Sequence, residues 1–220
     1  MTPENFIVAN AALTAPPLVP EIKLYLATEV VPLWRATEDE LAEQGVPPPY
    51  WAFAWAGGQA LARYVLDNPD TVRGKRVLDI GSGSGLVALA ASQAGAAAVL
   101  AADIDAFACA AIRLNAQVNR QTSHQTNHRD IAVTQDDLIG TANVWDVILV
   151  GDLFYERPLA ERLLAWLTPL RVPALLGDPG RNYFPKTQVE KLASYSVQTT
   201  RDLEDREIRE TGVYRLLTRG

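Results

Sequence analysis

A glycine-rich segment is the first part of the sequence whose residue types suggest ligand binding. It reads Gly-Ser-Gly-Ser-Gly at residues 81–85, with an apolar segment before it and an alanine-rich one after it. This order predicts a strand, a loop and a helix. Glycine permits positive φ angles and lets the backbone approach a ligand closely. We therefore expect Gly81 and Gly83 to contact a ligand, although Leu86 replaces the third glycine of a dinucleotide fingerprint.

Aspartates stand near the ends of three successive predicted strands: Asp79, Asp103 and Asp137. A carboxylate at Asp79 suits a cationic group such as an α-ammonium, and one at Asp103 can accept hydrogen bonds from both ribose hydroxyls. Asp136 or Asp137 can accept from an adenine amino group, and we choose Asp137 because Asp136 fits a solvated loop. A lone glycine loop would indicate only a tight turn. Together with three carboxylates, it predicts a site for S-adenosylmethionine, a nucleoside that carries an amino acid.

The strongest strand pattern, residues 145–151, leads directly into Asp152-Leu-Phe-Tyr155. Ligands of open α/β sheets bind at the carboxyl ends of strands, near the point where the strand order reverses. Asp152 can hold an amine there, and the ring of Tyr155 can line a channel and stabilise a cation. The alternatives are that Asp152 caps the following helix and that the aromatic rings belong to the core. We expect Asp152 and Tyr155 to be catalytic, and Phe154 to lie in the core.

An aromatic segment, residues 49–58, precedes the sheet and ends in two glycines. Its aromatic side chains at positions 51, 53 and 55 share one face if the segment is extended. A core strand and a lid over the cofactor both fit this pattern, and we expect Phe53 in the core and Trp55 at the cofactor. Asp178 and Arg181 follow the fifth predicted strand. Two interpretations remain open for them: the rim of the acceptor site, or a salt-bridged turn.

Strand and helix patterns alternate along most of the chain. Helices are predicted over 58–66, 85–94, 107–119, 156–167 and 188–195, and strands over 76–80, 98–103, 131–134, 145–151 and 174–177. Two further predicted strands, 196–201 and 212–218, have no crossover helix between them, which favours an antiparallel pair at one edge. The expected fold is α/β: a Rossmann-like, seven-stranded and mostly parallel sheet with helices on both faces and an antiparallel C-terminal edge.

Composition argues against several classes of protein. The chain has 220 residues, 48% of them hydrophobic, and a formal net charge of −6. This predicts a globular protein without the cationic field that nucleic-acid binding commonly uses. One cysteine and two histidines exclude an internal disulfide framework and argue against a zinc site, so we expect no metal. No signal peptide or membrane-spanning run is evident. We expect a cytoplasmic monomer that binds neither nucleic acid nor membrane.

Five segments resemble those of the seven-β-strand lysine methyltransferases, and within them the electron transfer flavoprotein β-subunit lysine methyltransferase family. They are PYWAFAWAGGQALARYVLDNPD at 49–70, RGKRVLDIGSGSG at 73–85, ADID at 102–105, WDVILVGDLFY at 145–155 and GDPGR at 177–181. The glycine loop alone would not be specific, but the five segments jointly are. The resemblance implies cofactor contacts at Asp79, Gly81, Gly83 and Asp103. It also implies that Asp152 and Tyr155 carry the Asp-x-x-Tyr acceptor motif of the family.

The resemblance implies S-adenosylmethionine-dependent methylation of lysines in the β subunit of electron transfer flavoprotein, with ribosomal protein L7/L12 as a second candidate substrate. A ribosomal protein L11-type or small-molecule methyltransferase remains an alternative, as does a non-catalytic cofactor-binding module. The proline-rich N-terminal segment matches less clearly, and a capping-box pattern at Thr37 predicts a helix over 37–44. We divide the chain into an N-terminal helical extension, residues 1–48, and a methyltransferase domain, residues 49–220.

Overall fold

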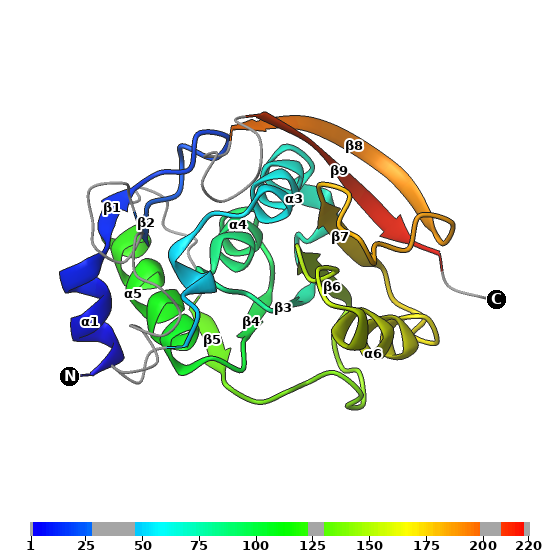
Figure 1. The fold of residues 1–220 in the computed structure, drawn as a ribbon, viewed down its shortest axis with the longest axis horizontal. Helices are drawn as coiled ribbons and strands as arrows, with labels where there is room; N and C mark the ends of the chain where they lie inside the picture. The colour runs from blue at the N-terminus through cyan, green and yellow to red at the C-terminus, as the bar shows by residue number, and fades with distance from the viewer. Residues whose placement is uncertain (1, 28–46, 123–129, 199–207, 218–220) are drawn as a thin grey trace.

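Seven strands form one central sheet in the computed structural model, which describes residues 2–27, 47–122, 130–198 and 208–217. The strand order is β5-β4-β3-β6-β7-β9-β8. The bounds are β3 (Arg76–Ile80), β4 (Ala98–Ala102), β5 (Ile131–Thr134), β6 (Val147–Gly151), β7 (Ala174–Asp178), β8 (Val189–Gln198) and β9 (Ile208–Leu216). Strands β3 to β7 run parallel, whereas β9 is antiparallel to β7 and β8 is antiparallel to β9 (Figure 1). The expected sheet, mostly parallel with an antiparallel C-terminal edge, is confirmed.

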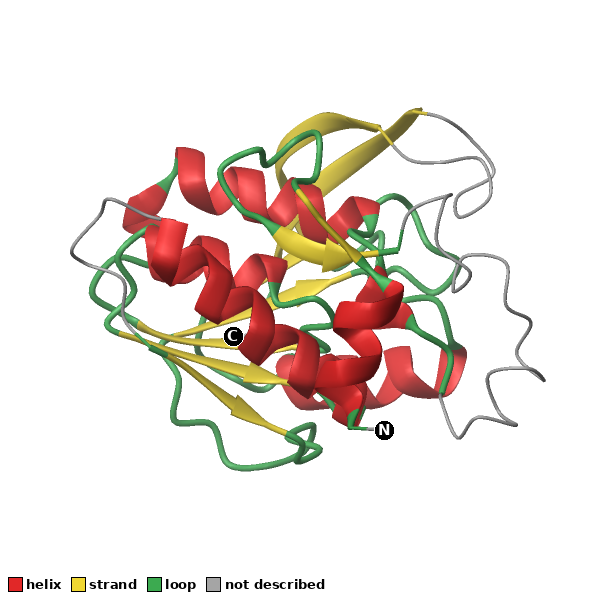
Figure 2. Ribbon diagram, turned by 90° about the vertical axis from the view of Figure 1, so that its left-hand side faces the viewer, coloured by secondary structure: helices red, strands yellow, loops and turns green. Residues whose placement is uncertain are grey.

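Helices cover both faces of this sheet (Figure 2). They are α3 (Ala56–Asp67), α4 (Leu86–Gln93), α5 (Ala106–Thr122) and α6 (Arg157–Leu167). Within β6, Val147 and Leu149 belong to the cluster with α3 and α4, whereas Ile148 and Val150 belong to the cluster with α6. All four side chains are buried. Burial on both faces explains why this strand is a continuous apolar run instead of an alternating one.

The strand order reverses beside β3. Strands β4 and β5 lie on one side of β3, and β6 and β7 lie on the other. Ile80 at the end of β3 pairs with Val150 near the end of β6. The loops that follow these two strands therefore begin at the same edge of the sheet, where ligands of such sheets bind.

The N-terminal segment forms α1 (Pro3–Asn10) and a two-stranded antiparallel sheet of β1 (Ala12–Thr14) and β2 (Leu24–Leu26). Thr2 caps α1, because its side chain accepts a hydrogen bond from the backbone N–H of Asn5. Phe6 and Ile7 of this helix are buried in a cluster with alanines of α5. The helix expected over 37–44 lies outside the described residues, so that expectation stays a prediction.

Two buried asparagines of α5 bind the backbone of the β2 segment. The side chain of Asn119 accepts from the backbone N–H of Lys23 at 3.0 Å and donates to the carbonyl of Lys23 at 2.6 Å. Asn115 accepts from the backbone N–H of Tyr25 at 2.8 Å and donates to the carbonyl of Ser84 at 2.8 Å. The side chain of Asn115 thus joins the N-terminal segment to the glycine loop.

The expected helix over residues 188–195 is wrong, because residues 189–195 belong to β8. A register shift between Lys191 and Ala193 interrupts the pairing with β9. Such an irregularity breaks the alternation of period two by which a strand is recognised in a sequence. The apolar residues then fall at helical spacing, although pairing with β9 determines the structure. Of the two expected final strands, residues 196–198 belong to β8 and 212–216 to β9.

The aromatic segment before α3 is not an extended strand. Residues Tyr50–Ala52 form a 3₁₀ helix, η2, in which the N–H of Ala52 donates to the carbonyl of Pro49 at 2.9 Å. The prolines before it have fixed φ angles and no N–H, which suits the start of a turn and not a paired strand. Trp51 is the fully buried ring of this segment, whereas Phe53, expected in the core, is only partly buried. A second 3₁₀ helix, η3 (Pro69–Thr71), follows α3.

Candidate active site

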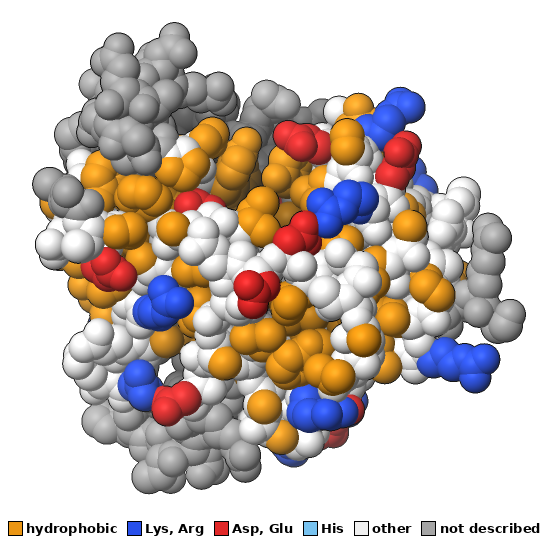
Figure 3. Space-filling view, turned by 90° about the horizontal axis from the view of Figure 1, so that it is seen from below, with side chains coloured by type: hydrophobic (Ala, Val, Ile, Leu, Met, Phe, Trp, Pro, Cys, Tyr) orange, Lys and Arg blue, Asp and Glu red, His pale blue; other side chains and the backbone are white. Residues whose placement is uncertain are grey.

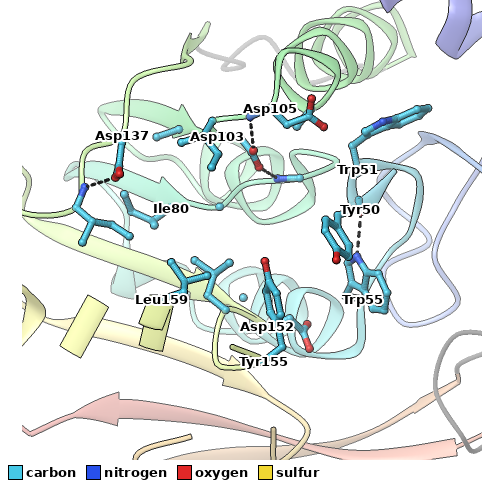
Figure 4. A pocket seen from close by; sticks show the side chains of 18 of the residues that line it. Tyr50, Trp51, Trp55, Ile80, Asp103, Asp105, Asp137, Asp152, Tyr155 and Leu159 are labelled. Atoms are coloured by element: carbon cyan, nitrogen blue, oxygen red, sulfur yellow. Dashed lines mark hydrogen bonds between the residues drawn. The ribbon is translucent and has the colours of Figure 1, made fainter. Parts of the chain in front are cut away.

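A cavity of about 540 Å³ lies at the carboxyl ends of β3, β4, β5 and β6. This volume is in the range of small-molecule sites, which is about 300–1,000 Å³. Residues predicted for the site from the sequence line it: Trp55, Gly81, Gly83, Asp103, Asp137, Asp152 and Tyr155. Figure 4 shows Asp103 and Asp137 on one side of this cavity, with Tyr155 and Asp152 opposite them. The fold therefore brings together residues that are far apart in the sequence.

The glycine loop has backbone angles that its sequence pattern requires. Gly81 and Gly83 have φ angles of +62° and +54°, which side-chain-bearing residues rarely adopt. A Cβ atom on Gly81 would also lie 2.6 Å from the side chain of Leu153. A side chain at position 81 would therefore strain the loop and displace Leu153. Contact of Gly81 and Gly83 with a cofactor stays a prediction.

Asp79 lies beneath the glycine loop and does not line the cavity. Its side chain is 1% exposed and accepts hydrogen bonds from the Ser82 hydroxyl at 2.6 Å and the Ala88 N–H at 3.1 Å. Burial raises the pKa of this carboxyl to about 7, against the opposing effect of the two donors. Through these bonds Asp79 connects the loop to the first turn of α4. The expected contact of Asp79 with an α-ammonium group stays a prediction.

Asp103 directly follows β4 and lines the cavity. Its two carboxylate oxygens accept from the Gly83 N–H at 2.8 Å and the Asp105 N–H at 3.0 Å. Burial raises the pKa of this carboxyl, and the two N–H donors oppose that rise. The neighbouring Ile104 lines the same cavity with 70% of its surface exposed. A carboxylate of fixed orientation thus stands beside an open apolar surface, as binding of a nucleoside requires.

Asp137 lines the cavity on the loop after β5 and pairs with Arg162 of α6 at 2.6 Å. It also accepts from the N–H of Ile139 at 3.1 Å. The hydrogen bond from Arg162 lowers the pKa of the Asp137 carboxyl. Asp136 lines the cavity too and accepts from the Thr134 hydroxyl at 2.6 Å. Both acids border the cavity, so the structure leaves the choice of Asp137 as the adenine contact a prediction.

Asp152 follows β6 with a φ angle of +59°, a left-handed conformation that few residue types tolerate. One carboxylate oxygen accepts from the Gly58 N–H at 2.9 Å, and the other accepts from Arg181 Nη2 at 2.8 Å and Nε at 3.2 Å. The helix that follows, α6, begins after Glu156 without a side-chain cap. Asp152 therefore caps the first turn of α3, and not the helix that follows it in the chain.

The start of α3 approaches the sheet so closely that a side chain would not fit. A Cβ atom on Gly57 would lie 2.2 Å from the carbonyl oxygen of Gly177 in β7 and 2.6 Å from the carboxylate of Asp152. A Cβ on Gly58, by contrast, would meet nothing within 4 Å. Gly57 thus allows the helix N-terminus to reach the Asp152 carboxylate.

Aromatic rings surround the part of the cavity next to Asp152. The rings of Tyr50 and Tyr155 lie 5.9 Å apart, and those of Tyr50 and Trp55 lie 6.2 Å apart. The indole N–H of Trp55 donates to the carbonyl of Tyr50 at 2.9 Å, as Figure 4 shows. The guanidinium of Arg181 lies 5.6 Å from the centre of the Trp55 ring. Phe154 is 1% exposed in the core, as expected.

Sequence reasoning missed Tyr50 and did not decide between two roles for Arg181. Tyr50 is 51% exposed, an unusual position for a large ring, and lines the cavity. The aromatic density of residues 49–55 was a usable signal, but we considered only the odd-numbered positions of an extended segment. Arg181 pairs with Asp152 and lines the cavity, which favours the acceptor rim over an isolated turn.

The described residues hold no group of three His, Cys, Asp or Glu side chains with the spacing of a metal site. Among the same residues, no helix is long and apolar enough to cross a membrane. On the face in Figure 3, lysine and arginine side chains are scattered among acidic and apolar ones instead of gathered in one patch.

Comparison with known proteins identifies the family. The sequence matches the family described as ribosomal protein L11 methyltransferase (PrmA) over residues 59–152. It is 43% identical over 204 residues to the electron transfer flavoprotein beta subunit lysine methyltransferase of Xenopus laevis, covering 89% of this chain and 79% of that protein. The human protein of the same name is 40% identical over 201 residues, covering 87% of this chain and 73% of that protein.

A solved structure of magnesium protoporphyrin IX methyltransferase from Synechocystis, with bound SAH, has the same fold. Its TM-score is 0.51 at 14% sequence identity, and the match covers 72% of this chain and 81% of that one. The L11 match ends at Asp152, whereas the flavoprotein-subunit relatives align over most of the chain. The chain therefore belongs to the electron transfer flavoprotein β-subunit lysine methyltransferase family, and it is a methyltransferase.

Proposed function

We propose that this protein transfers a methyl group from S-adenosylmethionine to lysine side chains of the β subunit of electron transfer flavoprotein. One observation carries the proposal beyond family membership. Asp103 and Asp152, at the carboxyl ends of strands on the two sides of β3, line a single cavity. A nucleoside and an amine can therefore be bound next to each other at one edge of the sheet.

The residues present fit the cofactor. Asp103 offers carboxylate oxygens toward a ribose, and Ile104 offers apolar surface toward a base. Gly81 and Gly83, which have positive φ angles, line the same cavity and can offer main-chain atoms to a ligand. When bound, the cofactor supplies a methyl group activated by a sulfonium. The protein's own part is to orient that methyl group and to exclude water from it.

Asp152 and Tyr155 bind the acceptor in this proposal. The carboxylate of Asp152 accepts a hydrogen bond from the lysine amine, and the Tyr155 ring contacts its methylene groups. Burial raises the pKa of the Tyr155 hydroxyl, so this ring stays neutral near physiological pH. The amine lone pair forms the new N–C bond, the C–S bond breaks with its electron pair going to sulfur, and a proton leaves nitrogen for water.

Transfer of labelled methyl groups tests the proposal. Purified protein is incubated with tritiated S-adenosylmethionine and, separately, the flavoprotein β subunit, L7/L12 and L11. We expect label on lysines of the flavoprotein subunit, located by mass spectrometry of its peptides. Asp152→Asn is the matched control, because it keeps the shape of the side chain; we expect transfer to fall about 100-fold or more, while calorimetry still detects cofactor binding. Label on L7/L12 or L11 alone would remove the flavoprotein subunit as substrate.

A further inference from the structure

The charge of Asp152 creates a difficulty for methylation of an amine. Lysine has an unperturbed pKa of about 10.4, so its side chain arrives as an ammonium without a lone pair. A lone carboxylate next to that ammonium favours the charged form and raises its pKa further. A site that contained only Asp152 would therefore bind lysine well and methylate it slowly.

The structure places a second charge at this point. Arg181 donates two hydrogen bonds to one oxygen of Asp152, from Nη2 at 2.8 Å and from Nε at 3.2 Å. Both side chains are largely buried, with 19% of Arg181 and 9% of Asp152 exposed, so water screens the pair less than it screens a surface pair. Arg181 and Asp152 both line the cavity. We call these two residues the acceptor pair.

Arg181 is held in place from both ends. Its backbone N–H donates to the carboxylate of Asp178 at 2.7 Å, and the N–H of Gly180 donates to the same oxygen at 2.6 Å. Its guanidinium lies 5.6 Å from the centre of the Trp55 ring. The cation is therefore part of a built arrangement, in which a turn after β7 and an aromatic ring fix its position.

We propose that Arg181 is the positioning residue that neutralises Asp152 and so lets the acceptor lysine lose its proton before methyl transfer. This inference rests on the proposed function. With Arg181 present, Asp152 acts as a hydrogen-bond acceptor that orients the amine, and not as a counterion that keeps it charged. The proton of the ammonium passes to water, and the neutral amine then attacks the methyl carbon. A nearby cation is a known way to lower the pKa of an amine nucleophile.

Other titratable groups around the acceptor pair also affect its charge. One of these groups is Asp178, which is 0% exposed. Burial raises the pKa of Asp178 to about 7, and the charge of Asp152 adds to that rise. Its second oxygen has no hydrogen-bond partner in the described part of the chain. In the described part of the chain, this region also contains Tyr155, on whose pKa Tyr50, Glu156 and Asp103 act, and Tyr214, whose pKa is raised by burial and by the charge of Asp178.

Ionisation of Asp178 acts against the effect of Arg181. As the pH rises through about 7, Asp178 gains a negative charge beside the acceptor pair. That charge favours the ammonium form of a bound lysine. The pH profile of kcat for the wild type therefore contains both the deprotonation of the bound lysine and the ionisation of Asp178. Asp178→Asn removes one of them while keeping a side-chain oxygen for the N–H groups of Gly180 and Arg181.

The test is the pH dependence of kcat at saturating cofactor and acceptor, because kcat reports pKa values of the enzyme–substrate complex. Arg181→Gln removes the charge and keeps a hydrogen-bond donor. We expect the pH at which kcat rises to be higher by about 1 unit or more when Arg181→Gln is introduced, both in the wild type and in the Asp178→Asn variant. Arg181→Lys keeps the charge and should restore the wild-type position of the profile. Arg215→Gln is the matched control, since Arg215 pairs with Glu190 at the outer sheet edge.

A purely structural role for Arg181 predicts a different result. Loss of a structural ion pair would lower kcat or thermal stability at every pH and leave the position of the profile unchanged. An unshifted profile in Arg181→Gln overturns the inference, and so does an equal shift in Arg181→Lys. Cofactor affinity, measured by calorimetry, confirms that each variant is folded.

A second measurement separates this inference from the proposed function. n-Butylamine mimics the lysine side chain, and its binding to the cofactor-free protein is followed by NMR at neutral pH. Because one pKa unit corresponds to a tenfold change in the protonation equilibrium, we expect Arg181→Gln to bind the butylammonium ion about tenfold more tightly than the wild type. Equal affinities overturn the inference. Tighter binding in a protein that methylates no flavoprotein subunit would refute the proposed substrate alone.

Discussion

Substitution of Gly57 by alanine gives a sharp test of how α3 is positioned. The added Cβ would lie 2.2 Å from the carbonyl oxygen of Gly177 and 2.7 Å from its carbonyl carbon. Both are backbone atoms of β7, a strand that is buried along its length and is paired on both sides, with β6 and β9. The same Cβ would lie 2.6 Å from the carboxylate of Asp152. The N-terminus of α3 must therefore shift away from the sheet.

The expected cost has two parts. Overpacking of a tight interior costs about 1–3 kcal/mol, and loss of the charged hydrogen bond between Asp152 and the Gly58 N–H costs about 1.5–3 kcal/mol. Together these lower the free energy of unfolding by about 2.5–6 kcal/mol, which corresponds to a fall in Tm of about 5–24 °C for a chain of this size. The neighbouring substitution Gly58→Ala is a control with the opposite sign, because its Cβ meets nothing within 4 Å. It should stabilise the helix by about 0.5–1 kcal/mol.

Thermal and urea unfolding of the two alanine variants, measured side by side, provide the assay. The reasoning requires that the variants differ by at least about 3 kcal/mol, with only Gly57→Ala below the wild type. Equal stabilities would mean that α3 adapts to a side chain at position 57. The close approach of the helix to Gly177 would then not be what positions Asp152.

Three further predictions concern single side chains. The pKa of Asp178 is about 7 in the folded protein, above the ordinary value of 3.8. Protonation of Asp178 therefore stabilises the folded state fully below about pH 4, and this stabilisation is lost as the pH rises through 7. Asp178→Asn should accordingly gain stability relative to wild type between pH 5 and pH 8 in urea unfolding, by a few kcal/mol at most; a constant difference would contradict the buried, ionisable carboxyl. Tyr155→Phe should keep most activity, whereas Tyr155→Ala should lower kcat/KM by roughly 2- to 30-fold through loss of the ring face, and equal losses in both variants would point to the hydroxyl instead. Asn115→Ala leaves the Tyr25 N–H and the Ser84 carbonyl without their buried hydrogen-bond partner. It should destabilise the protein by about 2–4 kcal/mol. An unchanged denaturation midpoint would show that other groups form hydrogen bonds with this N–H and this carbonyl.

The parts of the fold that the sequence predicted are those with local signals. The strand, glycine loop and helix around residues 76–94 follow from adjacent residues, since the turn needs glycine and the flanking segments are continuously apolar. Residues 189–195 of β8 were predicted as a helix because the pairing of this strand with β9 and its irregularity at Lys191 are not local features. The 3₁₀ helix at Tyr50 was missed because we read the alternation of aromatic residues and gave the preceding prolines less weight.

The candidate site divides in the same way. Positions at strand ends could be predicted, because parallel strands present their carboxyl ends at one edge. The direction in which each side chain points could not be predicted. Asp79 turns beneath the loop toward Ser82, and Asp152 turns toward Gly58 and Arg181, which lie 94 and 29 residues away along the chain. Such partners depend on how α3 and the turn after β7 pack on the sheet.

The attachment of β2 by Asn115 and Asn119 has a consequence for how this protein can diverge from its relatives. Both asparagines bind main-chain atoms of Lys23 and Tyr25, and neither uses the side chains of those residues. The main chain of the N-terminal segment is thus held by α5, and its exposed side chains remain open to exchange, whereas Val19, Ile22 and Leu24 are fully buried and must stay apolar. A chimera that replaces residues 12–26 by a homologous stretch of equal length should fold, whereas one that replaces α5 must carry both asparagines with it.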